Sequence, residues 1–342
     1  MRQDSFSSCG NSSRLSRQHG LSIVELMISI VLGLLLMAII AQIYLGSKQT
    51  YRGNENASRL QENGRFILHR MGQDIRMAGY LGCNRDVSVN NIAQPVSNTW
   101  LQYAQAVRGY TASTVPTSLL AAGEALSGTD VVQIQGAIGP AASLTGNMGV
   151  ANANVQINGN PGQLQADDIL LIADCANADV FRATTVSTGS GTVTIAHASS
   201  TNSSNFLSKA YEANTQVLRF GTYIYYVGTG AAGCSANMLC RKRLSGFNLT
   251  TEELVDNVEN MAFEYGEDTN GDGTPDRFVD AATVSNWANV NAMRLSLLLR
   301  SPEDFVTTTS QPYTFAGVTT TPGDRRLRRV FTTTVNIRNR TS

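Results

Sequence analysis

The fold is decided by residues 20–45, which read GLSIVELMISIVLGLLLMAIIAQIYL. From Leu26 to Leu45 almost every side chain is apolar, and a helix of that length can cross the hydrocarbon core of a bilayer. One carboxylate, Glu25, lies at the start of the run. Because a carboxylate is costly in lipid, it indicates a function there. The alternative is an ordinary signal anchor with a stray glutamate near the headgroups.

The residues that flank the apolar run favour the functional interpretation. A secretory signal peptide is cleaved after its apolar region, whereas Gly20, the candidate cleavage residue, precedes the run in this chain. Cleavage there would leave the apolar helix in the mature protein. The leader, residues 1–20, carries Arg2, Arg14 and Arg17, which predict a cytoplasmic leader and a periplasmic location for the rest of the chain.

This segment resembles the class III signal of type IV prepilins, in which a basic leader ends in Gly and Glu is the fifth mature residue. Gly20, Leu21 and Glu25 occupy these positions, although the family usually has Phe where this chain has Leu21. The resemblance implies cleavage after Gly20 and N-methylation of Leu21 by a prepilin peptidase. It also implies that Glu25 acts in assembly.

Length and charge set broad limits. The 342 residues suffice for one large or two modest domains in addition to a membrane helix. The formal charge is zero, and removal of the leader leaves 23 basic and 25 acidic residues, a charge of −2. This chain lacks the basic excess that is typical of proteins whose main partner is a nucleic acid.

Four cysteines remain once Cys9 is removed with the leader. An even number in an exported domain predicts two disulfides, and three pairings are open. Cys234 and Cys240 are expected to close a small local loop. Cys83 and Cys175 would then tie the end of the N-terminal helix to the globular domain. The alternative is free buried thiols.

The apolar helix is expected to continue into a polar but periodic stretch. We predict one helix over roughly residues 21–78, with a transmembrane half at 21–45 and an amphipathic half within 46–80; two helices with a hinge are the alternative. Five residues at helical spacing form the predicted buried face of the second half: Leu60, Gly64, Ile67, Met71 and Ile75.

Strand patterns dominate residues 81–342, which we interpret as one globular domain. The predicted fold class is therefore α+β, with a long N-terminal helix followed by a β-rich, mostly antiparallel domain. The expected strands are Asp130–Gln135, Asp168–Ala173, Val180–Val186, Thr192–His197, Gln216–Val227, Leu239–Leu244, Val258–Tyr265, Met293–Arg300 and Arg329–Arg338. Residues 81–128 and 136–165 are expected to form loops and short strands.

The resemblance extends into this domain. Residues 166–175, the pair Tyr265-Gly266 with its acidic loop, and residues 325–340 are similar to PilW-type minor pilins. The resemblance implies a periplasmic domain like that of the J-type minor pseudopilin, anchored by a single span in the inner membrane and later placed at the pilus tip. Implied partners are other minor pilins, the major pilin and the inner-membrane assembly platform, with a tip adhesin as a further candidate.

An acidic, glycine-rich segment runs from Asp268 to Asp276. Oxygen-bearing side chains at alternate positions of such a loop can converge on Ca²⁺ when glycine permits the sharp turn. The candidate ligands are Asp268, Asn270, Asp272, Thr274 (through its backbone carbonyl) and Asp276. The twelfth position is Val279 instead of Glu, so Glu264, Glu267 or Asp280 would have to complete the shell. The alternative is a metal-free hairpin turn.

No catalytic motif emerges, and we do not expect an enzyme. The three histidines lie outside nucleophile and metal motifs. The cluster Arg325–Arg329 is expected to be a solvated turn, with an anion or DNA site as the alternative.

Three functions compete. The first is a minor pilin that helps to initiate type IV pilus assembly, and the second is a J-like pseudopilin of a type II secretion system. The third is a membrane-anchored β-domain that binds DNA or a surface ligand. Whether such a pilus would serve twitching motility, adhesion or DNA uptake is left open.

Overall fold

The computed structural model describes residues 20, 22–82, 88–95, 98–101, 103, 105–189 and 191–340. The chain divides into two compact units, Met1–Arg52 and Gly53–Ser342, and we describe each by itself. The second unit contains the last turns of the helix and all the described strands.

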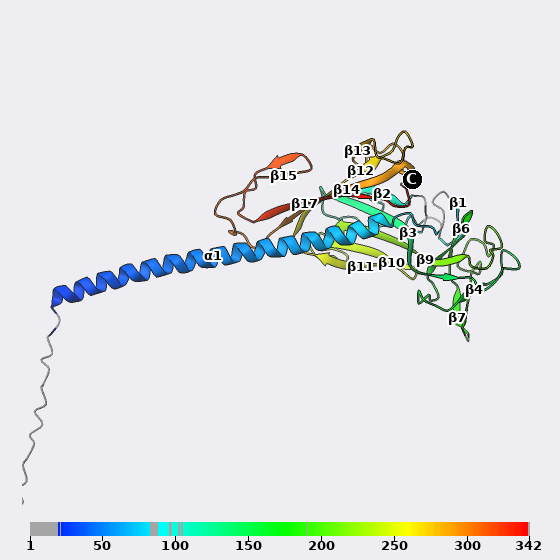
Figure 1. Ribbon diagram of the computed structural model, residues 1–342, viewed down its shortest axis with the longest axis horizontal. Coiled ribbons are helices and arrows are strands. Elements are labelled where there is room, and N and C mark those ends of the chain that lie inside the picture. The colour runs from blue at the N-terminus through cyan, green and yellow to red at the C-terminus, as the bar shows by residue number, and fades with distance from the viewer. Residues whose placement is uncertain are drawn as a thin grey trace, which may run out of the picture. The chain divides into compact units, whose positions relative to one another are not determined.

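Helix α1 (Ile23–Arg76) is one continuous helical segment, as predicted (Figure 1). Its first half is rich in Leu, Ile and Met, and Leu and Met are among the residues that most favour a helix. In the first unit these apolar side chains are exposed, and none of the most apolar window is buried. Among the described residues, α1 is the one helix long and apolar enough to span a membrane.

The second half of α1 buries one face against the domain. All five residues predicted for this face are buried, together with Asn56 and Gly72. Glycine at position 64 lets the helix approach Phe331, and Gly72 lies near Val335. The amphipathic pattern therefore predicted correctly which side of the helix packs.

The larger sheet has eight strands and is mostly antiparallel. Its main path runs β1-β6-β5-β9-β10-β11, and β3 pairs with both β2 and β9. Among the described strands, β1 and β6 are the one pair that is parallel. The bounds are β1 (Ser88–Asn91), β2 (Val107–Thr111), β3 (Asp130–Ser143), β5 (Ile169–Ala173), β6 (Asn177–Arg182), β9 (Gln216–Val227), β10 (Leu239–Ser245) and β11 (Asn248–Val255).

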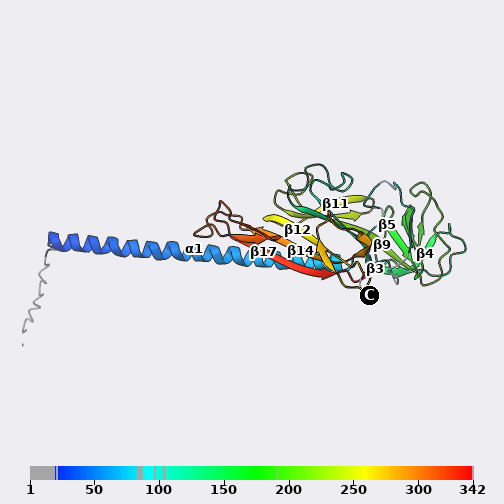
Figure 2. The ribbon, with the colours of Figure 1, turned by 90° about the horizontal axis from the view of Figure 1, so that it is seen from above.

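A four-stranded antiparallel sheet follows in the order β13-β12-β14-β17, and Figure 2 shows β12, β14 and β17 as neighbours. Two smaller sheets complete the domain: the hairpin β15-β16 and the three strands β4-β8-β7. The bounds are β4 (Val155–Asn158), β7 (Thr185–Thr188), β8 (Thr192–Ala196), β12 (Val258–Glu267), β13 (Arg277–Val279), β14 (Val290–Arg300), β15 (Tyr313–Phe315), β16 (Val318–Thr320) and β17 (Arg328–Asn336), with a 3-10 turn, η1, at Trp287–Asn289.

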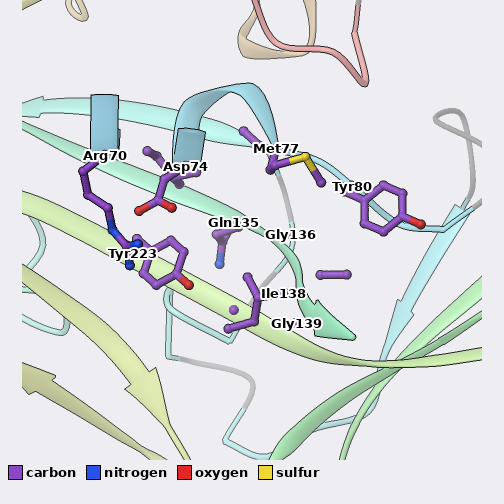
Figure 3. Close-up of a pocket in the computed structure, with 13 residues that line it drawn as sticks. Arg70, Asp74, Met77, Tyr80, Gln135, Gly136, Ile138, Gly139 and Tyr223 are labelled. Carbon is purple, nitrogen blue, oxygen red and sulfur yellow. The ribbon is translucent and has the colours of Figure 1, made fainter. Parts of the chain in front are cut away.

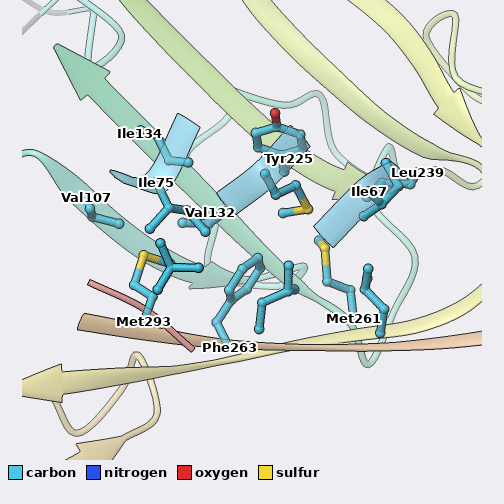
Figure 4. Packing of buried hydrophobic residues seen from close by; sticks show 14 of the residues in the cluster. Ile67, Ile75, Val107, Val132, Ile134, Tyr225, Leu239, Met261, Phe263 and Met293 are labelled. Carbon is cyan, nitrogen blue, oxygen red and sulfur yellow. The ribbon is translucent and has the colours of Figure 1, made fainter. Parts of the chain in front are cut away.

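The largest core cluster joins α1 to both principal sheets. Figure 4 shows Ile67 and Ile75 of α1 between side chains from the eight-stranded sheet, such as Val132, and side chains from the four-stranded sheet, such as Phe263. Ile67, Ile75 and Val132 have no exposed surface. Burial of a large aliphatic side chain contributes about 1.5–3 kcal/mol, so this cluster holds the end of α1 firmly in the domain.

Most predicted strands are present, with shifted ends, but the predicted strand Val180–Val186 is wrong. The chain leaves the larger sheet after Arg182, and Thr184 N donates to Ala196 O of the three-stranded sheet. The segment therefore belongs to two sheets, β6 in one and β7 in the other. The continuous apolar pattern did not reveal this crossing between sheets.

Candidate functional site

The processing and assembly residues lie at the start of the chain. Gly20 is exposed and precedes α1, whereas Leu21 lies outside the described residues. Glu25 occupies the first turn of α1, where a carboxylate suits the positive end of the helix dipole. Within the described residues, no hydrogen bond or ion pair engages the Glu25 carboxylate, and only its backbone carbonyl accepts from Ser29 Oγ, at 2.8 Å. The arrangement leaves this carboxylate available to a partner.

The acidic loop forms between β12 and β13. Asp268 accepts backbone N–H bonds from Gly271 at 2.6 Å and Gly273 at 2.8 Å. Both glycines have positive φ, at 80° and 86°, which a residue with a Cβ rarely adopts. Glycine thus permits the sharp turn that the sequence predicted.

Four of the five candidate calcium ligands, Asn270, Asp272, Thr274 and Asp276, are joined by hydrogen bonds in this loop. Asn270 Nδ2 donates to Asp272 Oδ2 at 3.2 Å and to Asp276 Oδ1 at 3.1 Å. Thr274 donates to Asp272 Oδ1 through both its N–H, at 2.8 Å, and its hydroxyl. Asp268 bonds to backbone amides instead of joining this group. The amide of Asn270 therefore bridges two of the candidate ligand carboxylates.

The residues proposed to complete the shell have other partners. Glu264 pairs with Arg294 at 2.9 Å, and Asp280 accepts from Thr283. The Glu267 carboxylate accepts hydrogen bonds from the backbone N–H groups of Ser285 and Asn286, which follow β13. Across the described residues, no group of three or more His, Cys, Asp or Glu is placed to hold a metal ion. Calcium binding by Asp268, Asn270, Asp272, Thr274 and Asp276 stays a prediction.

Glu267 anchors the base of the acidic loop. It has no exposed surface, and its carboxylate accepts from Ser285 N and Oγ at 2.8 and 2.7 Å, from Asn286 N at 2.9 Å and from Arg277 Nη2 at 2.8 Å. Burial alone would raise the pKa of Glu267, but these donors stabilise the charged form more strongly and hold the pKa at about 2. A buried, charged carboxylate therefore ties the loop to the chain after β13.

The predicted disulfide between Cys234 and Cys240 is present and closes the turn between β9 and β10. Cys175 is also disulfide-bonded. Cys83 lies outside the described residues, so its pairing with Cys175 stays a prediction.

A buried charge network clamps α1 to the larger sheet. The carboxylate of Asp74 accepts from Tyr225 Oη at 2.5 Å and from Arg241 Nη1 at 2.8 Å, and Arg241 also pairs with Glu252 at 2.8 Å. Arg241 is 3% exposed. Burial and the Asp74 carboxylate raise the pKa of the Tyr225 hydroxyl. Sequence reasoning missed this network because its members lie far apart in the chain and match no motif.

A pocket of about 260 Å³ lies beside this network. Figure 3 shows Arg70 and Asp74 projecting from α1 toward Tyr223 of β9, and Met77 and Ile138 also line the pocket. The Asp74 carboxylate is already neutralised by Arg241, and the pocket is open. The pocket therefore lies where α1 meets strands β3 and β9 of the larger sheet.

The arginine cluster Arg325–Arg329, which leads into β17, is only partly the solvated turn that we expected, because Arg329 alone among its arginines is exposed. Arg328 pairs with Glu259 at 2.8 Å and with Asp324 at 2.5 Å, and its side chain is 5% exposed. Arg326 donates to the backbone carbonyl of Ser301 at 2.8 Å. The carboxylates of Glu259 and Asp324 and the carbonyl of Ser301 make Arg328 and Arg326 structural, which the sequence pattern alone does not show.

Two protein-family models match this chain, one near its N-terminus and one in its C-terminal part. Residues 15–41 match the prokaryotic N-terminal methylation motif, which covers Gly20, Leu21 and Glu25. Residues 224–339 match PilW, the type IV pilus-assembly protein W family. The chain is a type IV pilin-like minor pilin with a PilW domain. That domain extends from the end of β9 past β17 and includes the acidic loop, the Cys234–Cys240 disulfide and Arg241.

Among solved structures, this minor pilin is similar to a type IV-like pilin from Thermus thermophilus. The sequences are 13% identical, the match covers 83% of this chain and 98% of the other, and the TM-score is 0.36. No curated protein matches the chain.

Proposed function

We propose that this minor pilin helps to initiate type IV pilus assembly, as part of a minor-pilin complex at the fibre tip. The observation that carries the proposal is the contrast within α1. Its first half exposes an apolar surface that contains one carboxylate, Glu25, whereas its second half is locked into the PilW-containing unit. An exposed apolar helix of this length needs a membrane or other apolar helices around it.

The proposed mechanism follows from the two environments of α1. In the inner membrane, lipid covers the apolar half and the β-rich domain lies on the periplasmic side. During assembly, the helix moves from lipid into a bundle of similar helices, where helix packing replaces lipid contacts. The domain travels with it because Asp74 and the shared core hold its second half in place.

Glu25 would set the register of this packing. An unpaired carboxylate is costly among apolar helices, and this one has no partner within the described residues. Its proposed partner is the α-amino group of the mature Leu21 of a neighbouring subunit, either the major pilin or another minor pilin. A register role is one of the better attested uses of a buried ion pair.

A gene deletion tests the assignment of the machine. Loss of this protein should abolish or strongly reduce surface pili while type II secretion continues at the normal level. Re-expression of the full-length chain should restore piliation. Normal piliation with impaired secretion would instead assign the chain to the pseudopilins.

A further inference from the structure

A second pocket, of about 250 Å³, lies on the larger sheet at the paired strands β2 and β3. Arg108 and Gln133 are directly opposed across these strands, so their side chains leave the sheet on the same face. Tyr110 and Gln135, each two residues further along its strand, lie on that face as well and also line the pocket. The chain before β2 contributes Thr99 and Gln105.

The pocket contains two buried amides with defined partners. Gln133 and Gln135 are each 4% exposed. Gln133 Nε2 donates to Thr99 O at 3.1 Å, and its Oε1 accepts from Tyr110 Oη at 3.2 Å. Gln135 Nε2 donates to Trp100 O at 3.3 Å and to Thr222 Oγ1 at 3.2 Å. These bonds fix the orientation of the polar wall before any ligand arrives.

Two polar groups of the pocket have no hydrogen-bond partner among the described residues. One is Gln105 Oε1, which is buried and accepts no hydrogen bond from that part of the chain. The guanidinium of Arg108 makes no hydrogen bond or ion pair with any described residue, although it lies 6.0 Å from the centroid of the Tyr110 ring and 5.8 Å from that of Trp287. Contacts at this distance from aromatic faces hold a guanidinium in place while leaving its N–H groups available.

A ligand that satisfies the pocket must donate a hydrogen bond to Gln105 Oε1 and accept hydrogen bonds from the Arg108 guanidinium. It must also place an apolar surface against Tyr110. A sugar ring has hydroxyl groups that donate and accept and C–H faces that pack on aromatic rings, and a carboxylate on the ring would form a bidentate contact with arginine. We propose that this pocket binds one monosaccharide unit that carries a carboxylate, such as a hexuronic acid.

Binding can be measured with the full-length processed protein in a detergent that has no sugar headgroup. Glucuronic acid and glucose are the probes, titrated by calorimetry and by tryptophan fluorescence, because Trp287 lies beside Arg108. Saturable binding is expected, with glucuronic acid bound more tightly than glucose. Arg108→Gln should weaken glucuronic acid binding by roughly tenfold or more, since a hydrogen bond to a charged group is lost, and should affect glucose much less.

Gln105→Leu should weaken binding of both sugars, because both lose the same acceptor. Arg243→Gln removes an exposed arginine from β10 and is the matched control; it should bind like the wild type. The absence of saturable binding by either sugar would overturn the proposal, as would equal binding by the wild type and both pocket variants. Displacement of glucuronic acid by an acidic dipeptide that binds more tightly would make the pocket a peptide site and would also overturn it.

Discussion

Gly64 of helix α1 lies directly against the aromatic ring of Phe331 in strand β17. A Cβ built at position 64 would lie 2.6 Å from ring atoms of Phe331. Real Cβ atoms do not approach so closely, and the partly buried ring of Phe331 packs against the core cluster. Glycine in a helix interior normally costs stability, so at this position close packing outweighs helix propensity.

Gly64→Ala should therefore destabilise the folded protein. Overpacking costs about 1–3 kcal/mol, which exceeds the gain of about 1 kcal/mol from better helix propensity. Gly53→Ala is the matched control, because nothing lies within 4 Å of a Cβ at that position of the same helix. It should be neutral or stabilising. Denaturant unfolding of both variants checks the difference, and equal stability would contradict the packing argument.

Cleavage is expected after Gly20. Replacing Gly20 with a bulky residue should leave the full-length chain, with its leader, in the membrane, because a prepilin peptidase requires the small residue at this position. Intact-mass measurement and N-terminal sequencing of the wild type should place the mature start at Leu21, with one added methyl group. A mature start at any other residue would refute the prepilin interpretation of this segment.

Glu25→Ala should separate targeting from assembly. Insertion depends on the apolar run and the leader arginines, so the variant should reach the membrane and be cleaved. Incorporation should fail, because the α-amino group of a neighbour loses its carboxylate partner, and an unpaired buried charge costs on the order of several kcal/mol.

The distribution of the cleaved subunit between membranes and sheared fibres measures this effect. Glu25→Asp, which keeps the charge, should recover part of the incorporation. Normal recovery of Glu25→Ala in fibres, with normal piliation, would show that Glu25 does not set the register.

The acidic loop is expected to bind Ca²⁺, in which case the Asn270 side-chain N–H group would have to release the carboxylates of Asp272 and Asp276. Calcium at 100 times its Kd would then stabilise the fold by about 2.7 kcal/mol. Combined replacement Asp268→Ala and Asp272→Ala should abolish both the heat of binding and the calcium-dependent rise in Tm. Asp167→Asn, in a separate exposed turn, is the control. If the wild type showed neither the heat of binding nor the rise in Tm, the loop would be a metal-free turn and the calcium prediction would be wrong.

Acid should destabilise the fold partly through Glu267. Its pKa is about 2 in the folded protein and about 4.3 in an unfolded chain, so its stabilising contribution is present above pH 4.3 and is lost as the pH falls toward 2. Glu267→Gln should lower stability at neutral pH and flatten the fall in stability between about pH 5 and 2. Unfolding midpoints at successive pH values measure both effects, with Glu62→Gln on the exposed face of α1 as control. Parallel profiles for Glu267→Gln and the wild type would exclude this role.

The sequence revealed the features that depend on neighbours along the chain. Helix α1, its buried residues Ile67 and Ile75, most strands and the Cys234–Cys240 turn follow from periodicity and short spacings. The acidic loop was visible for the same reason, since its glycines and oxygen-bearing residues lie within one short segment. Strands β13, β15 and β16 were missed because each has only three residues, too few to establish a period.

Local sequence patterns did not predict the contacts between residues that are far apart in the chain. The partnership of Asp74 with Arg241 joins residues 167 positions apart, and Phe331 selects glycine at position 64 from across the fold. The arginines before β17 looked solvated because the carboxylate of Glu259 that neutralises Arg328 arrives from another strand. By itself, the sequence determined that the chain has a long apolar helix with one carboxylate at its start and a β-rich domain, because hydrophobic period and motif spacing are local. Only the tertiary structure decided which charges are buried, which glycine is obligatory and which polar groups line a pocket, because burial and pairing depend on segments that meet only after folding.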